Sequence, residues 1–224
     1  MRILLVGAGG VGSAFTAIAA RRDFFEVCVV ADYDVARSRK AVDALADDRF
    51  VAAQVDASDE ASVESLVREH RVTHVMNAVD PRFVMPIFNG AFAGGADYLD
   101  MAMSLSRPHP ESPYAECGVK LGDEQFAVAG DWESNGRLAL VGMGVEPGLS
   151  DVFARYAADH LFSEINEVGV RDGADLVVAG YDFAPSFSIW TTIASKKSRR
   201  AAIAVNAPPT PPAPIKRILM SGLS

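Results

Sequence analysis

Three glycines near the N-terminus have the spacing of a phosphate-binding turn. In the stretch ILLVGAGGVGSA, Gly7, Gly9 and Gly12 follow the pattern G-x-G-x-x-G, between an apolar run typical of a strand and a helical pattern. The first glycine permits a tight turn, the second lets a pyrophosphate approach the backbone, and the third lets the helix pack on the strand. Gly10 and Val11 open the helix, whose free amides would face the phosphates of a dinucleotide. A glycine-rich turn without a ligand is the alternative interpretation.

Asp32 is the second candidate for binding a dinucleotide. It ends the next apolar run, where a carboxylate accepts hydrogen bonds from the adenosine ribose and repels a 2′-phosphate. This favours NAD over NADP. Arg37 and Arg39 follow closely and have the charge to bind such a phosphate, so the predicted cofactor is NAD or NADP, with NAD favoured. A surface aspartate that starts a turn is the alternative reading of Asp32.

Two further stretches follow predicted strands, at the edge of the sheet where ligands gather. Asp56 and Ala57 come after the third strand and would flank the adenine. Asn77, Ala78 and Val79 end the fourth strand and would run past the ribose and pyrophosphate. For both stretches an ordinary loop remains the alternative.

Short apolar runs alternate with helical patterns over the first 140 or so residues. Strands are expected at 2–6, 26–32, 50–56, 72–79, 97–102 and 137–143, and helices at 10–22, 34–46, 59–70, 83–95 and 112–134. This alternation predicts an α/β fold, a doubly wound parallel sheet with helices on both faces. The predicted dinucleotide-binding domain spans residues 1–143.

The pattern changes after Met143. A loop and an amphipathic helix are followed by two apolar runs joined at Asp172-Gly173, a strong hairpin signal that predicts the start of an α+β substrate domain over 144–193. Residues 194–224 hold six basic and no acidic residues and include APPTPPAP, so we expect a disordered tail there.

Composition excludes several classes of partner. The net charge is −8, which disfavours binding to nucleic acid or to an anionic membrane. The two cysteines are far apart, the start is not typical of a signal peptide, and no apolar run approaches the ~18 residues of a membrane span. We therefore expect a cytoplasmic protein. His70 and His74 straddle a helix-to-strand boundary, so no metal site is predicted.

Absent motifs narrow the chemistry. The Tyr-x-x-x-Lys pair of short-chain reductases does not occur, because no lysine has a tyrosine four residues before it. Spacing alone identifies no catalytic acid or base. Hydride transfer needs mainly positioning by the protein, so the lack of such a pair does not exclude a dehydrogenase.

The chain resembles the saccharopine dehydrogenase family and its relatives over about residues 1–193. The similarity is carried by GAGGVGSAF, VADYD, MNAVDP, YLDMAMSLSRPHP, GVKLGDEQF, LVGMGVEPGLSDVFARYAADHLF and VRDGADLVVAGYDFAPSFSIWTTI. The resemblance implies a Rossmann domain followed by an α+β substrate domain. It also implies an oxidoreductase that uses NAD(P) on a carbon–nitrogen bond of an amino acid, such as lysine or saccharopine, through an imine.

On this resemblance, the site residues follow from the expected geometry. Asp100 and Met101 end the fifth strand, where the nicotinamide should lie, and Asp100 is the candidate for a polar group near the reacting carbon. Gly144, Pro147 and Gly148 would shape a loop before a helix whose N-terminus receives a substrate carboxylate. The alternatives are an ordinary strand-end aspartate and an interdomain turn with Ser150 as the helix N-cap.

The sequence departs from the family pattern after Thr192. The change predicts either a truncated or frame-shifted chain or an unusual natural tail, and a non-catalytic dinucleotide-binding fragment is the alternative to an enzyme. The expected partner is a small amino-acid or imine substrate. Apolar residues crowded near the end of the family-like region also suggest a homo-oligomer.

Overall fold

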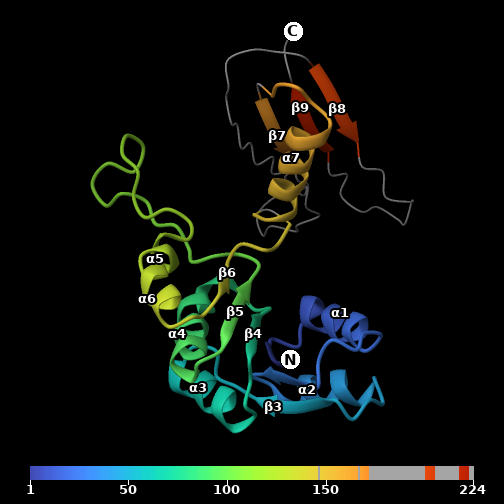
Figure 1. Cartoon of the computed structure of the whole chain (residues 1–224). Helices are drawn as coiled ribbons and strands as arrows, with labels where there is room; N and C mark the ends of the chain where they lie inside the picture. The colour runs from blue at the N-terminus through green and yellow to red at the C-terminus, as the bar shows by residue number, and fades with distance from the viewer. Residues whose placement is uncertain (146, 166, 172–199, 205–216, 222–224) are drawn as a thin grey trace, which may run out of the picture. The chain divides into compact units, whose positions relative to one another are not determined.

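The chain forms two compact units in a computed structural model, Met1–Pro147 and Gly148–Ser224. Residues 1–145, 147–165, 167–171, 200–204 and 217–221 are described (Figure 1). The boundary after Pro147 lies slightly beyond Met143, where the sequence pattern changes.

A six-stranded parallel sheet forms the centre of the first unit (Figure 1). Its strands are β1 (Arg2–Val6), β2 (Val27–Asp32), β3 (Phe50–Gln54), β4 (His74–Asn77), β5 (Asp97–Asp100) and β6 (Ala139–Leu140). Their order is β3-β2-β1-β4-β5-β6, and every pair is parallel. The strand order reverses between β1 and β4, which confirms the predicted doubly wound fold.

Helices cover both faces of this sheet. On one face α1 (Gly10–Ala19) and α2 (Val35–Asp43) contribute to a core with the side chains of Ile3 and Leu5. On the other face α3 (Glu60–Glu69), α4 (Val84–Gly94) and α6 (Ala129–Ser134) pack around Leu4 and Val6. Successive residues of a strand point to opposite faces, so an uninterrupted apolar strand feeds both cores at once.

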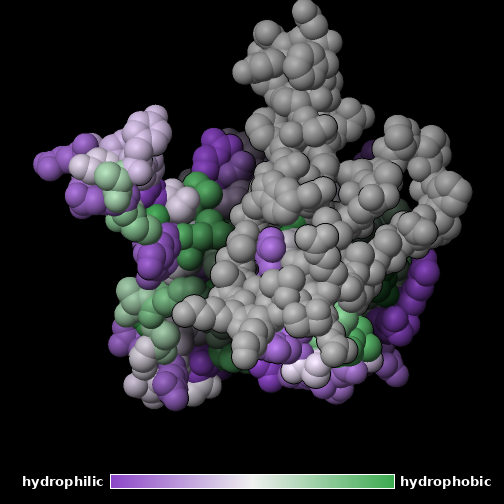
Figure 2. Space-filling view, turned by 90° about the horizontal axis from the view of Figure 1, so that it is seen from above, coloured by the Kyte–Doolittle hydropathy of each residue, from purple (hydrophilic) through white to green (hydrophobic). Residues whose placement is uncertain are grey.

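The segment between β5 and α6 differs from the predicted helix over 112–134. Only α5 (Asp123–Phe126) and α6 are helical, and residues 105–122 form a projecting loop with one antiparallel bridge between Arg107 and Val119. The loop carries mainly hydrophilic residues on its surface (Figures 1 and 2). Gly118 allows two backbone segments of this loop to lie close together, because a Cβ there would lie 2.1 Å from the Arg107 carbonyl oxygen. The close approach of two backbone segments replaces the helix.

The predicted sixth strand is also shorter than expected. Residues 137–143 were expected to be extended, yet only Ala139 and Leu140 pair with β5. Gly142 adopts a left-handed backbone with φ +69°, which ends the strand. The helix expected at 83–95 is confirmed as α4, preceded by a 3-10 turn at η1 (Pro81–Phe83).

The second unit holds α7 (Leu149–His160) and a three-stranded antiparallel sheet. Its strands β7 (Glu167–Arg171), β8 (Arg200–Ala204) and β9 (Arg217–Ser221) lie in the order β7-β9-β8. Within residues 194–224, where we expected a disordered tail, the structure has the two strands β8 and β9. Their apolar content suits strands, although the surrounding composition predicted none. The hairpin expected at Asp172-Gly173 lies outside the described residues.

No helix within the described ranges is long and apolar enough to cross a membrane. Both cysteines are free thiols. Cys28 is buried in β2, and this burial raises its pKa to about 12, whereas Cys117 is exposed on the projecting loop.

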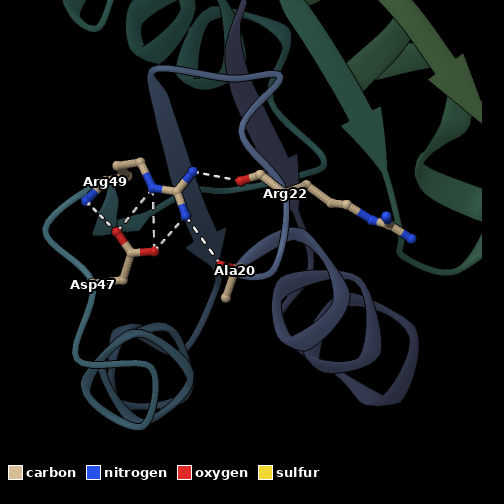
Figure 3. A network of polar contacts seen from close by, with 4 residues as sticks. All are labelled: Ala20, Arg22, Asp47 and Arg49. Atoms are coloured by element: carbon tan, nitrogen blue, oxygen red, sulfur yellow. Dashed lines mark hydrogen bonds and ion pairs between the residues drawn. The ribbon is translucent and has the colours of Figure 1, made fainter.

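Arg49 joins the end of α1 to the start of β3 (Figure 3). Its guanidinium donates to the carbonyl oxygens of Arg22 at 2.6 Å and Ala20 at 3.2 Å, beyond the last turn of α1. The same group forms hydrogen bonds of 2.7–3.2 Å with the Asp47 carboxylate, and it lies 4.6 Å from the centre of the Phe25 ring. One side chain thus satisfies carbonyls that the helix leaves without partners.

We expect Arg49→Ala to lower the urea midpoint of unfolding. Arg49→Lys should lower it less, because it keeps the positive charge beside Asp47. It should still lower it, since an ammonium cannot bind the carboxylate and the carbonyl oxygens together as the planar guanidinium does. The Arg49 hydrogen bond holds the pKa of Asp47 below its ordinary value of 3.8. The stability from this pair is therefore present above pH 3.8 and is lost as the pH falls through the lower folded-state value. Urea titrations at several pH values should show the gap between wild type and Arg49→Ala narrowing in acid; a constant gap would contradict this assignment.

Candidate functional site

The glycine turn between β1 and α1 is held by close backbone contacts. Gly7 has φ +106°, and its N–H donates to the carbonyl oxygen of Ala31 at 2.7 Å. A Cβ on Gly7 would lie 2.8 Å from the Ala78 carbonyl oxygen. A Cβ on Gly12 would lie 1.9 Å from the Gly7 carbonyl oxygen, far inside van der Waals contact. These two glycines are required by the fold itself.

The middle of the motif is open. A Cβ added at Gly9 or Gly10 would meet no atom within 4 Å, and Val11 is half exposed. Gly9 is the N-cap of α1 and has no side chain to bind the first amides of the helix, so these amides are left without a side-chain cap. A dinucleotide pyrophosphate needs this combination of close backbone approach and free helix N-terminal amides. The residues present therefore fit the predicted cofactor.

Asp32 supports the turn from the end of β2. Its Oδ2 accepts a hydrogen bond from the Ala8 N–H at 2.8 Å, and its Oδ1 accepts one from the Asp34 N–H at 3.0 Å. The side chain is only partly buried. A carboxylate has about four lone-pair sites, so two remain for the ribose hydroxyls. Asp32 thus has a structural role that the sequence left open as an alternative, and its contact with ribose stays a prediction.

Asp56 and Ala57 follow β3 at the same edge of the sheet. The Asp56 carboxylate accepts from the Ser58 hydroxyl at 2.6 Å and the Ser58 N–H at 2.9 Å, and these bonds lower its pKa. Ala57 packs against the main core. The geometry shows a local turn here, and contact with an adenine remains a prediction.

Asn77 ends β4 with its side chain turned into the protein. It is 2% exposed, its Nδ2 donates to the Tyr98 hydroxyl at 3.0 Å, and its Oδ1 accepts from the Val79 N–H at 3.1 Å. The groups beside Gly7 are instead the Ala78 carbonyl and the Val79 side chain. Of the three residues predicted here, Ala78 and Val79 meet the glycine turn and Asn77 holds them in place.

Tyr98 was not among the candidate residues of the sequence. It is 2% exposed, and its ring packs 5.1 Å from that of Phe88. Burial, together with the negative charge of Asp100, raises the pKa of Tyr98 well above its ordinary value of 10.0. Its hydroxyl therefore stays protonated and serves as the partner of Asn77.

Asp100 is buried at the end of β5, with 1% of its surface exposed. Its Oδ1 accepts from the N–H groups of Gly142 at 2.7 Å and Met103 at 3.1 Å. Its Oδ2 accepts from Nε2 of Gln125 at 2.7 Å. The aspartate predicted to lie near the reacting carbon is thus committed to three donors of the protein.

The loop after β6 folds back over the end of β5. A Cβ on Gly144 would lie 2.4 Å from the Met101 carbonyl oxygen and 3.2 Å from that of Pro147. The structure therefore brings together the predicted residues Met101, Gly144 and Pro147, as the close packing of a glycine requires.

Gly148 belongs to the second unit, where it is the N-cap of α7. Ser150, the alternative N-cap, lies inside the helix instead. The Gly148 N–H donates to Oδ2 of Asp151 at 3.0 Å, so one amide at this helix start already faces a carboxylate of the protein. Its binding of a substrate carboxylate remains a prediction.

Comparison with known proteins places this geometry in context. Residues 3–140 match the saccharopine dehydrogenase NADP-binding domain. The carboxynorspermidine synthase of Vibrio cholerae is 29% identical over 181 residues, covering 77% of this chain and 43% of that protein. The carboxyaminopropylagmatine dehydrogenase of Synechocystis is 26% identical over 171 residues, covering 76% and 41%. The chain thus spans less than half the length of these relatives.

A solved structure shows the same fold. The saccharopine dehydrogenase (L-Glu forming) of Saccharomyces cerevisiae superposes with a TM-score of 0.58 at 15% identity, over 77% of this chain and 34% of that one. The sheet order, the glycine turn and the family match agree with one another. The chain belongs to the family of the saccharopine dehydrogenase NADP-binding domain.

Proposed function

We propose that the first unit binds a nicotinamide dinucleotide, and that the protein is an NAD(P)-dependent oxidoreductase acting on a carbon–nitrogen bond. The observation that carries this proposal is the contrast among the motif glycines. Gly7 and Gly12 are fixed by the fold, while Gly9 and Gly10 leave open the space that a pyrophosphate needs. The family match supports the same function.

The reaction that fits this family is interconversion of an imine and a secondary amine. In the reducing direction, a bound reduced nicotinamide would supply a hydride to the imine carbon, and a proton would add to the nitrogen, which would leave the oxidised dinucleotide and a carbon–nitrogen single bond. Such chemistry depends chiefly on holding two reactants in line. The loops after β4 and β5, each held at its start by a hydrogen bond from a strand-end side chain, suit that task.

For the substrate, we propose an amine that carries a carboxylate. The names of the relatives from Vibrio and Synechocystis denote carboxylated polyamines or agmatine derivatives, and the yeast structure is a saccharopine dehydrogenase. A carboxylated polyamine is therefore favoured over lysine or saccharopine, on which the sequence resemblance had centred. The partner of the protein is then a small molecule.

For the cofactor, the charges around β2 favour NAD. The Asp32 carboxylate lies beside the glycine turn, where it accepts from the Ala8 N–H, and Asp34 forms an ion pair with Arg37 at 3.9 Å. Arg37 is thus partly neutralised by Asp34, and both Arg37 and Arg39 are exposed. The family is described by its NADP binding, so both dinucleotides belong in the test.

We expect Gly9→Val to abolish dinucleotide binding without changing the thermal midpoint. The backbone at Gly9 has φ −76° and open space around it, so a branched side chain fits the protein but fills the place of the pyrophosphate. Gly12→Ala is the matched control, because its Cβ meets the Gly7 carbonyl and should lower stability by about 1–3 kcal/mol. Calorimetric titration and thermal melts separate the effects; full affinity in Gly9→Val would contradict the site.

We expect Asp32→Asn to shift the preference from NAD toward NADP. The amide oxygen still accepts from the Ala8 N–H, and the Asp34 N–H, which loses its carboxylate oxygen, is exposed to water. Loss of the charge removes repulsion of a 2′-phosphate. NAD affinity should fall by about tenfold or more, the equivalent of one charged hydrogen bond. Fluorescence titration with NADH and NADPH measures both affinities. An unchanged ratio would show that Asp32 only supports the turn.

Turnover should follow with carboxynorspermidine or saccharopine as the amine and NAD or NADP as the oxidant. The measurement is formation of the reduced dinucleotide, with Gly9→Val as the inactive control. Since the chain spans under half of its relatives, a non-catalytic dinucleotide-binding fragment is the second candidate. Tight cofactor binding without turnover of either amine would favour that candidate.

A further inference from the structure

The carboxylate of Asp100 gathers segments that are separate in the sequence. Through three hydrogen bonds it connects the turn after β5 at Met103, the segment after β6 at Gly142, and α5 at Gln125. Gln125 is itself 3% exposed, and its Oε1 accepts from the Ser104 N–H at 2.8 Å. Asp100 and Gln125 therefore form a buried hydrogen-bonded pair, here called the bracket, which binds the turn 101–104 through the N–H groups of Met103 and Ser104.

The two amides bound by Oδ1 of Asp100 come from residues with unusual backbone. Met103 has φ +63° and Gly142 has φ +69°, both in the left-handed region. For methionine this conformation is unfavourable and persists only where the surroundings impose it. The Met103 side chain also lies against Gly142, where a Cβ would be 2.4 Å from its Cε. The carboxylate thus fixes two left-handed positions against each other.

The position of this bracket at the edge of the sheet indicates which part of the cofactor site it supports. A dinucleotide on a doubly wound sheet lies across the carboxyl ends of the strands at the point where the strand order reverses, here between β1 and β4. The adenosine half then lies over β1, β2 and β3. The nicotinamide half lies over β4, β5 and β6, where residues 101–104 and 142–144 emerge.

We infer that Asp100 and Gln125 are positioning residues that shape the nicotinamide end of the cofactor site. This inference rests on the proposed function. Asp100 is too buried and too fully engaged by protein donors to contact the substrate. It acts through the backbone of Met103 and Gly142, which it holds at the edge of the sheet.

Exchanging the two groups tests the pairing. In Asp100→Asn the new NH2 group takes the place of Oδ2 and faces the Gln125 amide. If Gln125 keeps its orientation, its own NH2 group meets that NH2 group. If Gln125 turns over, its NH2 group meets the Ser104 N–H instead. In Gln125→Glu two carboxylates face each other. The double variant Asp100→Asn/Gln125→Glu restores one donor opposite one acceptor and keeps the Ser104 contact. We therefore expect each single variant to lose affinity and the double variant to regain it.

The measurement compares the affinity for the whole dinucleotide with the affinity for ADP-ribose, which lacks the nicotinamide. If wild type prefers NADPH, the 2′-phosphate of ADP-ribose takes the place of ADP-ribose. Each single variant should bind the reduced dinucleotide about tenfold more weakly, the equivalent of one lost hydrogen bond, and ADP-ribose as wild type does. Arg49→Ala is the stability control, since it should lower the unfolding midpoint and leave the ratio of the two affinities unchanged.

Met103→Gly keeps the test valid if the single variants do not fold. Glycine adopts a positive φ without strain, so the turn forms but is less constrained. We expect this variant to keep its thermal midpoint and to lose affinity for the dinucleotide but not for ADP-ribose. Equal losses for both ligands, or a double variant no better than the singles, would overturn the inference. Failure of the wild type to bind either ligand would instead overturn the proposed function.

Discussion

The contact between Gly12 and the carbonyl of Gly7 is the constraint on which the first unit depends. It places the first turn of α1 directly against the end of β1, closer than any side chain allows. With the helix so near, its N-terminus lies just after the carboxyl end of β1, where the strand order reverses. The position of the helix N-terminus and the free space beside Gly9 follow from that approach.

Around this edge, polar side chains at the strand ends hold the loops that follow. Asp32, Asp56 and Asn77 end or follow β2, β3 and β4, and each accepts a hydrogen bond from the N–H two residues later. Asp100 does the same for the N–H three residues later. Bonds of this kind are the ordinary means by which Asp and Asn form turns. Four loops are thus fixed before any ligand arrives, which lowers the entropy cost of binding.

This arrangement explains how much the sequence could predict. Uninterrupted apolar runs and the glycine spacing indicated the sheet, its order of elements and the cofactor turn. The sequence also identified the polar residues at the strand ends. It did not show whether their side chains point toward a ligand or into the protein, because a turn-forming Asp and a ligand-binding Asp have the same local pattern. Asn77 and Asp100 are turned inward by partners distant in sequence, Tyr98 and Gln125. The loop 105–122 depends likewise on a close approach of Gly118 to Arg107 that no periodicity reveals.

The two halves of the proposed cofactor site differ in how readily their polar residues can be substituted. Asp32 is partly exposed, and one acceptor oxygen is enough for its part-buried bond to the Ala8 N–H, since the Asp34 N–H is exposed, so the charge at the proposed ribose position can vary while the fold is kept. Asp100 and Gln125 are both buried, and each satisfies groups that the other cannot. An unpaired buried polar group is costly, so these two residues can change only together. Cofactor choice is therefore free to diverge at the proposed adenosine end, while the loops at the proposed nicotinamide end stay fixed by the buried pair Asp100 and Gln125.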